Sequence, residues 1–181
     1  TALMYITEEL SKNGNIDRAL ICIDEFNDES SKIKAIENIA LKLVKSGKLK
    51  RARSLFQKVI YFNNEVQNVF KIENRIRNIS RQLAKQGSLD FAHSYMSQIT
   101  NSNVSKDDVL CVISSEYAKR GKIDVALGYM NQITDDKRKD DALMFISIEF
   151  AKRGNVHQSS KYLNRIINLK NKNKSLFNIS S

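Results

Sequence analysis

Proline is absent from this chain of 181 residues, and glycine occurs only six times. These are the residues that most disfavour the interior of a helix, so their scarcity permits an almost entirely helical chain. No Asn-Gly or Asp-Gly turn lies between alternating apolar and polar runs, which is the usual sequence signal of a β-hairpin. With 41% hydrophobic residues, the chain can still bury a sizeable core. These features predict an all-α protein.

Residues for catalysis and metal binding are also scarce. Cys22 and Cys111 lie 89 residues apart, without the CxxC spacing of a metal or redox site. His93 and His157 have no cysteine, serine elbow or glycine-rich phosphate loop beside them. The acidic stretches "DESS" and "SKDD" are predicted to be loop or capping segments. We therefore expect no catalytic residue, no metal site and no cofactor, and interpret the protein as not an enzyme.

Long apolar runs are missing as well. No run approaches the length of a membrane span, and the chain does not open with a signal peptide. Two isolated thiols suit a reducing compartment, so we expect a cytoplasmic protein. Acidic residues are in deficit, which gives a net charge of +10 and a pI near 9.6. This surplus favours an acidic partner, which is a peptide, a nucleic acid or an anionic membrane surface.

The chain does contain one short phrase five times over. The phrases are "SKNGNIDRA", "VKSGKLKRA", "AKQGSLDFA", "AKRGKIDVA" and "AKRGNVHQS", whose glycines follow one another by 33, 40, 34 and 33 residues. Large apolar residues stand eleven and four residues before each glycine. Isoleucine stands eight before every one, at Ile6, Ile39, Ile79, Ile113 and Ile146. These offsets predict a helix with one apolar face. The glycine is expected to end this helix by adopting the left-handed conformation, after which a second helix begins.

Small residues recur at two further places in each copy. Seven residues before the glycine stand Thr7, Ala40, Ser80, Ser114 and Ser147. Five residues after it stand Ala19, Ala52, Ala92, Ala126 and Ser159. A small residue lets two helices approach closely. One helix pair cannot hide its apolar face alone, so neighbouring copies are expected to stack.

This pattern resembles the tetratricopeptide repeat, a helix-turn-helix unit of about 34 residues. The family's tryptophan is replaced by Leu or Ile, and its closing proline is missing. The resemblance implies a right-handed superhelical α-solenoid of antiparallel helix pairs, with about five repeats and the start of a sixth. We expect a single repeat domain over 1–181, as a fragment of a longer protein. The expected repeats are 1–32, 33–71, 72–106, 107–139 and 140–172, with a partial sixth at 173–181.

The pentatricopeptide repeat has a similar period and reads RNA one base per repeat. Its base-reading position lies about ten residues before the glycine. Here that position holds Met4, Glu37, Arg77, Cys111 and Met144. Because this set cannot read base edges as a code, sequence-specific RNA reading is disfavoured.

Basic and amide side chains of the first helices are the candidate partner-binding residues. A lysine stands two residues before every glycine, where the tetratricopeptide family often faces its concave groove. A second row, on one face of the third first helix, runs from Asn74 to Lys85. The candidates are Lys34, Asn38, Lys45, Asn74, Arg77, Asn78, Arg81, Lys85, Lys119 and Lys152. The alternative is a solvated helix face whose lysines favour the negative end of the helix dipole.

The step of 40 residues exceeds 33 by seven, which is two helical turns. The extra residues lie around "YFNNEVQNVFKI", with Phe62, Val66, Val69 and Phe70 at helical spacing. Either this segment projects as a docking or dimer surface, or it fills a gap between the second and third repeats. A homo-oligomer through residues 60–72 or through the exposed repeat ends stays open.

Taken together, these observations favour a non-catalytic scaffold that binds a peptide or protein, expected to be acidic, in a concave groove. One alternative is binding of RNA or another nucleic acid through phosphate contacts on a basic face, without a base-reading code. Another is a regulatory or substrate-recruiting domain of a longer multidomain protein.

Overall fold

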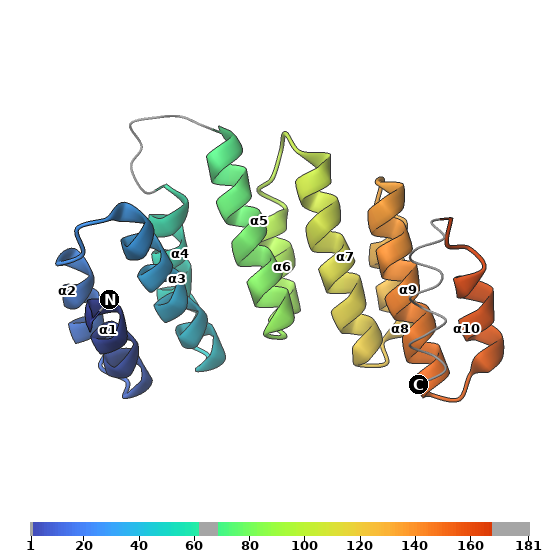
Figure 1. Cartoon of the computed structure of the whole chain (residues 1–181), viewed down its shortest axis with the longest axis horizontal. Helices are drawn as coiled ribbons and strands as arrows, with labels where there is room; N and C mark the ends of the chain where they lie inside the picture. Colours follow the sequence, from blue (N-terminus) through green and yellow to red (C-terminus); the bar gives the residue numbers. More distant parts are fainter. Residues whose placement is uncertain (1, 62–68, 168–181) are drawn as a thin grey trace. The chain divides into compact units, whose positions relative to one another are not determined.

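The computed structural model describes residues 2–61 and 69–167, which form ten α-helices and no strand (Figure 1). This confirms the all-α prediction. The chain divides into two compact units, Thr1–Arg75 and Ile76–Ser181. The first contains α1 (Ala2–Lys12), α2 (Ile16–Asp24), α3 (Glu29–Lys45) and α4 (Leu49–Ile60). Helix α5 (Val69–Lys85) contains the boundary, and the second unit continues with α6 (Leu89–Met96), α7 (Asn103–Lys119), α8 (Ile123–Asn131), α9 (Asp136–Lys152) and α10 (Val156–Leu163).

A glycine turn joins the two helices of each pair. All five repeat glycines have a φ between +74° and +90°, the left-handed region that glycine adopts without steric cost. The N–H of the residue after the glycine donates to the carbonyl of the residue four before the glycine. In the first turn this bond runs from Asn15 to Leu10 over 2.9 Å. The same bond recurs at the other four turns, with lengths of 2.9 or 3.0 Å. This is the Schellman ending of a helix, and it confirms the predicted glycine conformation.

Small residues lie where the two helices of a pair meet. Ser114 on α7 and Ala126 on α8 are both fully buried. The Ser114 hydroxyl donates to the carbonyl of Ala126 over 2.8 Å, and Ser147 makes the matching bond to Ser159 over 3.0 Å. A side chain can reach the backbone of the facing helix only when the helices are close. The predicted small positions therefore do set the helix spacing in these two pairs.

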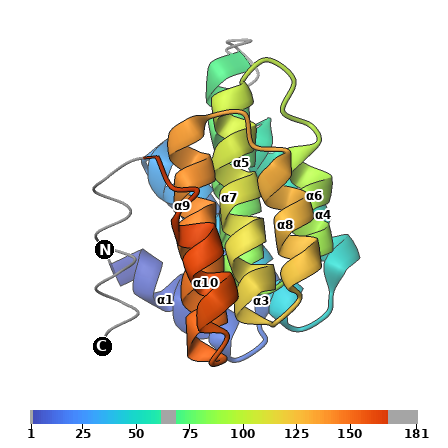
Figure 2. The ribbon, with the colours of Figure 1, turned by 90° about the vertical axis from the view of Figure 1, so that its right-hand side faces the viewer.

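Neighbouring pairs pack through their first helices. Helix α1 packs on α2 and α3, and α7 packs on α8 and α9. In the second unit α7 and α9 lie in one layer, with α6 and α8 in the other (Figure 1, Figure 2). The isoleucine eight residues before the glycine is at the centre of this packing, because Ile39, Ile113 and Ile146 are at most 1% exposed. Ile6 of α1 is the exception, at 45% exposed.

The remaining sequence predictions on the fold concern the expected sixth repeat, the insertion and a membrane span. The expected sixth first helix, and Phe62 and Val66 of the insertion, lie outside the described residues. Val69 and Phe70 are exposed in the first turn of α5. Within residues 2–61 and 69–167, none of the helices combines the length and the apolarity that crossing a membrane requires.

Exchanging Gly121 for alanine should lower the free energy of unfolding by about 1–2 kcal/mol, because alanine is strained in the left-handed region. An added Cβ would also press on the guanidinium of Arg153. The matched control is Gly128→Ala in α8, where a Cβ meets nothing within 4 Å. This change should raise stability by about 0.5–1 kcal/mol, since alanine favours a helix. Urea unfolding followed by circular dichroism measures the free energy of unfolding of both variants. Changes of the same sign in the two variants would contradict the left-handed conformation of Gly121.

Candidate partner-binding surface

The predicted site residues lie on the first helices of both units. In the first unit, Lys34, Asn38 and Lys45 are exposed on α3, and Asn74 is half-buried on α5. In the second unit, α5 carries Arg77, Asn78, Arg81 and Lys85, and Lys119 and Lys152 lie near the ends of α7 and α9. Asn78 and the three lysines are exposed, whereas Arg77 and Arg81 are half-buried.

The repeated lysines differ in whether an acid of their own helix neutralises them. Lys119 pairs with Glu116 over 2.7 Å and Lys152 with Glu149 over 2.9 Å, each three residues earlier. Lys12 pairs in the same way with Glu9. Ion pairs between exposed residues three apart on a helix contribute little to stability because water and salt screen them, so these lysines can readily exchange the acid for another partner.

Two members of the row lack that acid. The residue three before Lys45 is Lys42, and the residue three before Lys85 is Gln82. Neither Lys45 nor Lys85 forms an ion pair with any residue that the structure describes. The predicted lysine row therefore has one uncompensated charge on α3 and one on α5.

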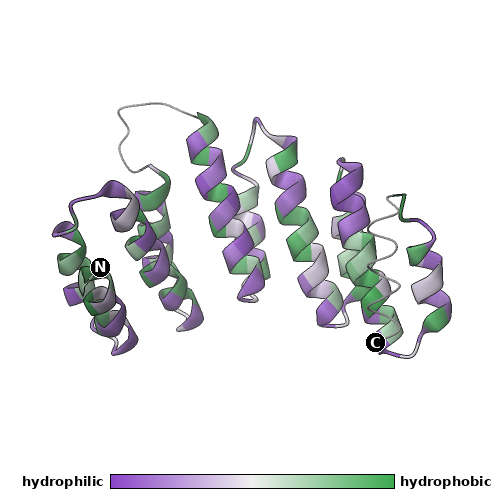
Figure 3. Ribbon diagram, viewed as in Figure 1, coloured by the Kyte–Doolittle hydropathy of each residue, from purple (hydrophilic) through white to green (hydrophobic). Residues whose placement is uncertain are grey.

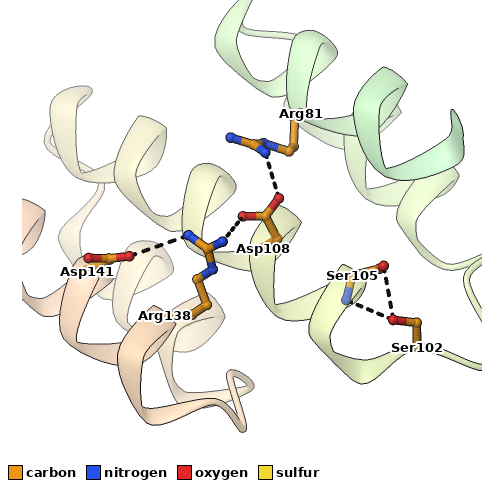
Figure 4. Close-up of polar contacts among 6 residues, drawn as sticks. All are labelled: Arg81, Ser102, Ser105, Asp108, Arg138 and Asp141. Atoms are coloured by element: carbon orange, nitrogen blue, oxygen red, sulfur yellow. Dashed lines mark hydrogen bonds and ion pairs between the residues drawn. The ribbon is translucent and has the colours of Figure 1, made fainter. Parts of the chain in front are cut away.

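Arg81 is already engaged by a neighbouring helix (Figure 4). Its Nη1 lies 2.7 Å from Oδ2 of Asp108 on α7, and Arg138 of α9 reaches the other oxygen of that carboxylate at 3.1 Å. Arg138 also contacts Asp141 at 3.5 Å. Asp108 is 5% exposed, so its charge is compensated by these two guanidinium groups rather than by water. Asp108 of α7 thus binds a guanidinium from each of two other first helices, α5 and α9.

Arg77 contrasts with Arg81, although both lie on the same face of α5. Its Nε is buried, with no hydrogen-bond partner in the described part of the chain. No ion pair of Arg77 occurs there either. The position ten residues before the glycine holds apolar Met4 and Met144 in other repeats. Arg77 is therefore a cation with unused hydrogen-bonding capacity.

Of the two alternatives for "SKDD", loop or capping, the structure shows capping: the N-cap Ser102 accepts from the N–H of Ser105 over 3.2 Å (Figure 4). The two acids of the stretch lie inside α7. Oδ2 of Asp107 accepts hydrogen bonds from the N–H and hydroxyl of Thr134, at 3.1 and 2.7 Å, and from the N–H of Asp135, at 2.7 Å. Asp140 accepts in the same way from the N–H of Ile167 over 3.1 Å. These buried acids satisfy the backbone of the loop after the second helix.

Buried acids at the position of Asp107 recur in the sequence, although the sequence analysis did not predict them. Glu73, Asp107 and Asp140 each stand fourteen residues before a glycine, and all three are buried. The first turns of α9, which contain Asp140 and Asp141, are hydrophilic, and the remainder of that helix is hydrophobic (Figure 3). The burial of an acid in so polar a segment depends on its partners in other segments.

Cys111 is buried on α7, within electrostatic reach of Arg81, Asp108, Arg138 and Asp141. Burial raises the pKa of its thiol to about 12, and the carboxylate of Asp141 adds to the rise while Arg138 opposes it. His93 packs edge-to-face on Tyr129, with ring centroids 5.8 Å apart, and His157 is exposed on α10. No group of three or more His, Cys, Asp or Glu residues with metal-binding geometry occurs among the residues that the structure describes.

Comparisons with known protein families, with curated proteins and with solved structures find no match to this chain. The likeness to tetratricopeptide repeats therefore stays a prediction that rests on the repeated residues themselves.

Asp107→Ala should lower the free energy of unfolding by about 3 kcal/mol, because it removes three charge-assisted hydrogen bonds that overlap in effect. Asp136→Ala is the control, since Asp136 is exposed in the first turn of α9. It should cost less than about 1 kcal/mol, the usual contribution of an acid at a helix N-terminus. Thermal unfolding followed by calorimetry compares the two. Similar losses would show that the Asp107 bonds do not hold the loop.

One thiol per native chain should react rapidly with a disulfide reagent at pH 8. The raised pKa keeps Cys111 protonated, and the thiolate is the reacting species. Cys22 is only partly buried and should supply the reactive thiol. Titration with Ellman's reagent should give one fast thiol in the native protein, two in denaturant and none in native Cys22→Ser. A fast thiol in that native variant would show that Cys111 is accessible.

Proposed function

We propose that this chain is a non-catalytic scaffold of the tetratricopeptide-like type, which binds an acidic peptide or protein through its first helices. The proposal includes a right-handed solenoid of helix pairs and a cytoplasmic location. The five glycine-linked helix pairs support it. The observation that carries the binding function is the pair of uncompensated cations on α5, Arg77 and Lys85, with exposed Asn78 beside Arg77.

These three side chains offer complementary chemistry to a peptide. The planar guanidinium of Arg77 can donate two parallel hydrogen bonds to one carboxylate. Lys85 supplies a point charge two turns further along α5, and the amide of Asn78 can donate to or accept from a peptide backbone. An acidic ligand would pair with the half-buried guanidinium of Arg77, which has no ion pair among residues 2–61 and 69–167.

A nucleic-acid ligand is the second candidate, favoured by the net charge of +10. A protein that binds phosphates nonspecifically needs a continuous stripe of lysine and arginine. Acids of α7 and α9 interrupt the basic surface. Glu116 and Glu149 pair with Lys119 and Lys152, and Asp108 and Asp141 together balance Arg81 and Arg138. This interruption of the basic stripe favours an acidic peptide over a nucleic acid as the ligand. Recruitment of a substrate to a longer enzyme would use the same first-helix surface.

The test compares a charge-reversed surface with a control of equal charge. Arg77→Glu/Lys85→Glu removes the two uncompensated cations and leaves the Arg81–Asp108 pair in place. Lys122→Glu/Lys161→Glu makes the same change in net charge at exposed positions around α8 and α10. The probes are a fluorescein-labelled peptide of alternating Glu and Ala and a single-stranded uridine oligonucleotide, followed by fluorescence anisotropy.

The α5 variant should weaken peptide binding by at least about tenfold, whereas the control changes it by less than about threefold. Equal losses in both variants would show that only net charge matters and would overturn the proposed surface. Binding of the oligonucleotide alone, with an affinity that falls steeply with salt, would replace the peptide by a nucleic acid.

A further inference from the structure

The first unit contains a cavity of about 260 Å³ between the turn that joins α1 to α2 and the turn that joins α3 to α4. Its walls include Lys12 of α1, Lys42 of α3, Lys48 before α4, and Gly14 and Ser46 of the two turns. No aspartate or glutamate is among the described residues that line it. Because a hollow lined by charges of one sign attracts ions of the other sign, this cavity favours anions.

The second unit shows which group fills the corresponding space in later repeats. The residue before the glycine is Arg120 in the fourth repeat and Arg153 in the fifth. Each guanidinium lies over the glycine of the preceding turn, where a Cβ on Gly87 or Gly121 would collide with it. The guanidinium of Arg153 also donates to the carbonyl of Lys119 over 3.5 Å. In both places an arginine of this chain fills the space between successive turns.

This arginine is missing from the first unit, where its position holds Ser46. The glycine and the lysine that the guanidinium of Arg153 contacts correspond here to Gly14 and Lys12. Ser46, Gly14 and Lys12 all line the cavity. Apart from the chain neighbours of Gly14, none of the described residues has an atom within 4 Å of the point where a Cβ on Gly14 would stand. The cavity is therefore the place that an arginine fills in the second unit.

A lysine also replaces an acid at this end of the first unit. Five residues before the glycine, the fourth and fifth repeats have Glu116 and Glu149, and the second repeat has Lys42. The ammonium of Lys42 donates to the carbonyl of Glu8 over 3.1 Å. Because this exchange places a cation in the wall of the cavity, it favours an anion as the occupant over the guanidinium of a partner.

Two carboxylates of α1 act on these lysines without lining the cavity. Glu9 and Glu8 pair with Lys12 at 2.7 and 3.5 Å. Burial lowers the pKa of Lys42, the two carboxylates oppose this change, and Lys12 adds to it. Neither Lys42 nor Lys48 forms an ion pair with any residue that the structure describes. Two ammonium groups of the wall are therefore available to an anion.

A buried hydroxyl lines the cavity as well. Ser11 is 6% exposed, and its hydroxyl forms no hydrogen bond with a residue of the described ranges. The same position holds Val44, Ala84, Ala118 and Ala151 in the other repeats. A buried hydroxyl without a partner costs free energy unless an acceptor in the cavity satisfies it. A serine at a position that is otherwise apolar therefore indicates an acceptor that enters from outside the chain.

We propose that this cavity binds a phosphate monoester, as carried by a phosphoserine side chain of a partner polypeptide or by a free small phosphate. Such a group has a charge of about −1.5 to −2 at pH 7 and three acceptor oxygens. These properties match the ammonium groups of Lys42 and Lys48 and the hydroxyl of Ser11, whereas a carboxylate has one charge and two oxygens. The cavity belongs to the first unit, and the inference does not depend on the proposed surface of α5.

The probe is a fluorescein-labelled peptide with blocked ends, Ala-Ala-phosphoserine-Ala-Ala, which contains no other acid. Fluorescence anisotropy at moderate salt should give a Kd on the order of 0.1 mM, as for a small ligand held by charge-assisted hydrogen bonds. The same peptide with glutamate in place of phosphoserine should bind at least about tenfold more weakly. The peptide with unmodified serine should not bind.

Competition with inorganic phosphate distinguishes the two sources of the phosphate group. A Kd for inorganic phosphate more than about threefold above that of the phosphopeptide assigns the cavity to a phosphoserine side chain, because the polypeptide then contributes contacts of its own. A smaller difference assigns it to a free small phosphate.

Lys42→Gln/Lys48→Gln should weaken binding of the phosphopeptide by at least about tenfold, since it removes both unpaired charges. Lys34→Gln/Lys58→Gln makes the same change in net charge at exposed positions of α3 and α4, and should change the affinity by less than about threefold. Ser11→Ala should weaken binding by about two- to tenfold. Thermal unfolding establishes that each variant is folded, and alanine at the position of Ser11 already occurs in three other repeats.

Absence of saturable phosphopeptide binding by the wild type would overturn the proposal. Equal binding by the wild type and by the folded Lys42→Gln/Lys48→Gln variant would do the same, since the ligand would then lie elsewhere. Glutamate peptide binding as tight as that of the phosphopeptide would overturn the phosphate assignment. Arg77→Glu/Lys85→Glu should keep its phosphopeptide affinity within about threefold of the wild type, so that failure of this inference and failure of the proposed function are separable.

Discussion

The glycine turn is the constraint on which the rest of this structure depends. Its left-handed glycine lets the next N–H bond back to the carbonyl four residues before the glycine, which fixes the start of the second helix relative to the first. Only in that register do a buried serine such as Ser114 and a buried alanine such as Ala126 meet across the helix pair. The apolar faces then align, and stacking of pairs buries the isoleucine of each later repeat.

Most of the helix-pair architecture could be predicted from the sequence, because glycine spacing and helical periodicity are local signals. The buried acids could not be predicted in the same way. Asp107 and Asp108 stand in a polar stretch that looks like a loop, and their burial depends on Thr134, Arg81 and Arg138. Those partners lie 27 to 30 residues away in the chain. The face of α5 was recognisable from its spacing, but the pairing that separates Arg81 from Arg77 was not.

This pairing also determines how the positive charge is distributed. The net charge of +10 suggests a broadly basic protein, yet the acids of α7 and α9 neutralise the lysines and arginines nearest to them. Among the lysines two residues before the glycines, Lys45 and Lys85 form no ion pair with the described residues, and their repeats have no acid three residues earlier. Arg77 likewise has none, at a position that holds Met4 and Met144 in other repeats. Within this row of lysines, differences between repeats therefore decide which charges are paired.

The same reasoning applies to the apolar positions. Where the copies agree, as at Ile39 and Ile146, the residue is buried and serves the packing. Differences between the repeats at apolar positions have two causes, the place of the residue in the array and the type of the residue. Ile6 has the same identity as its counterparts but lies on a face of α1 that no preceding pair covers in the structure, so its exposure follows from its place in the array. Leu55 is buried in its own unit, at a position that holds Tyr95, Tyr129 and Tyr162 in the later repeats, so its difference is one of residue type. Only the second kind of difference is visible in the sequence alone.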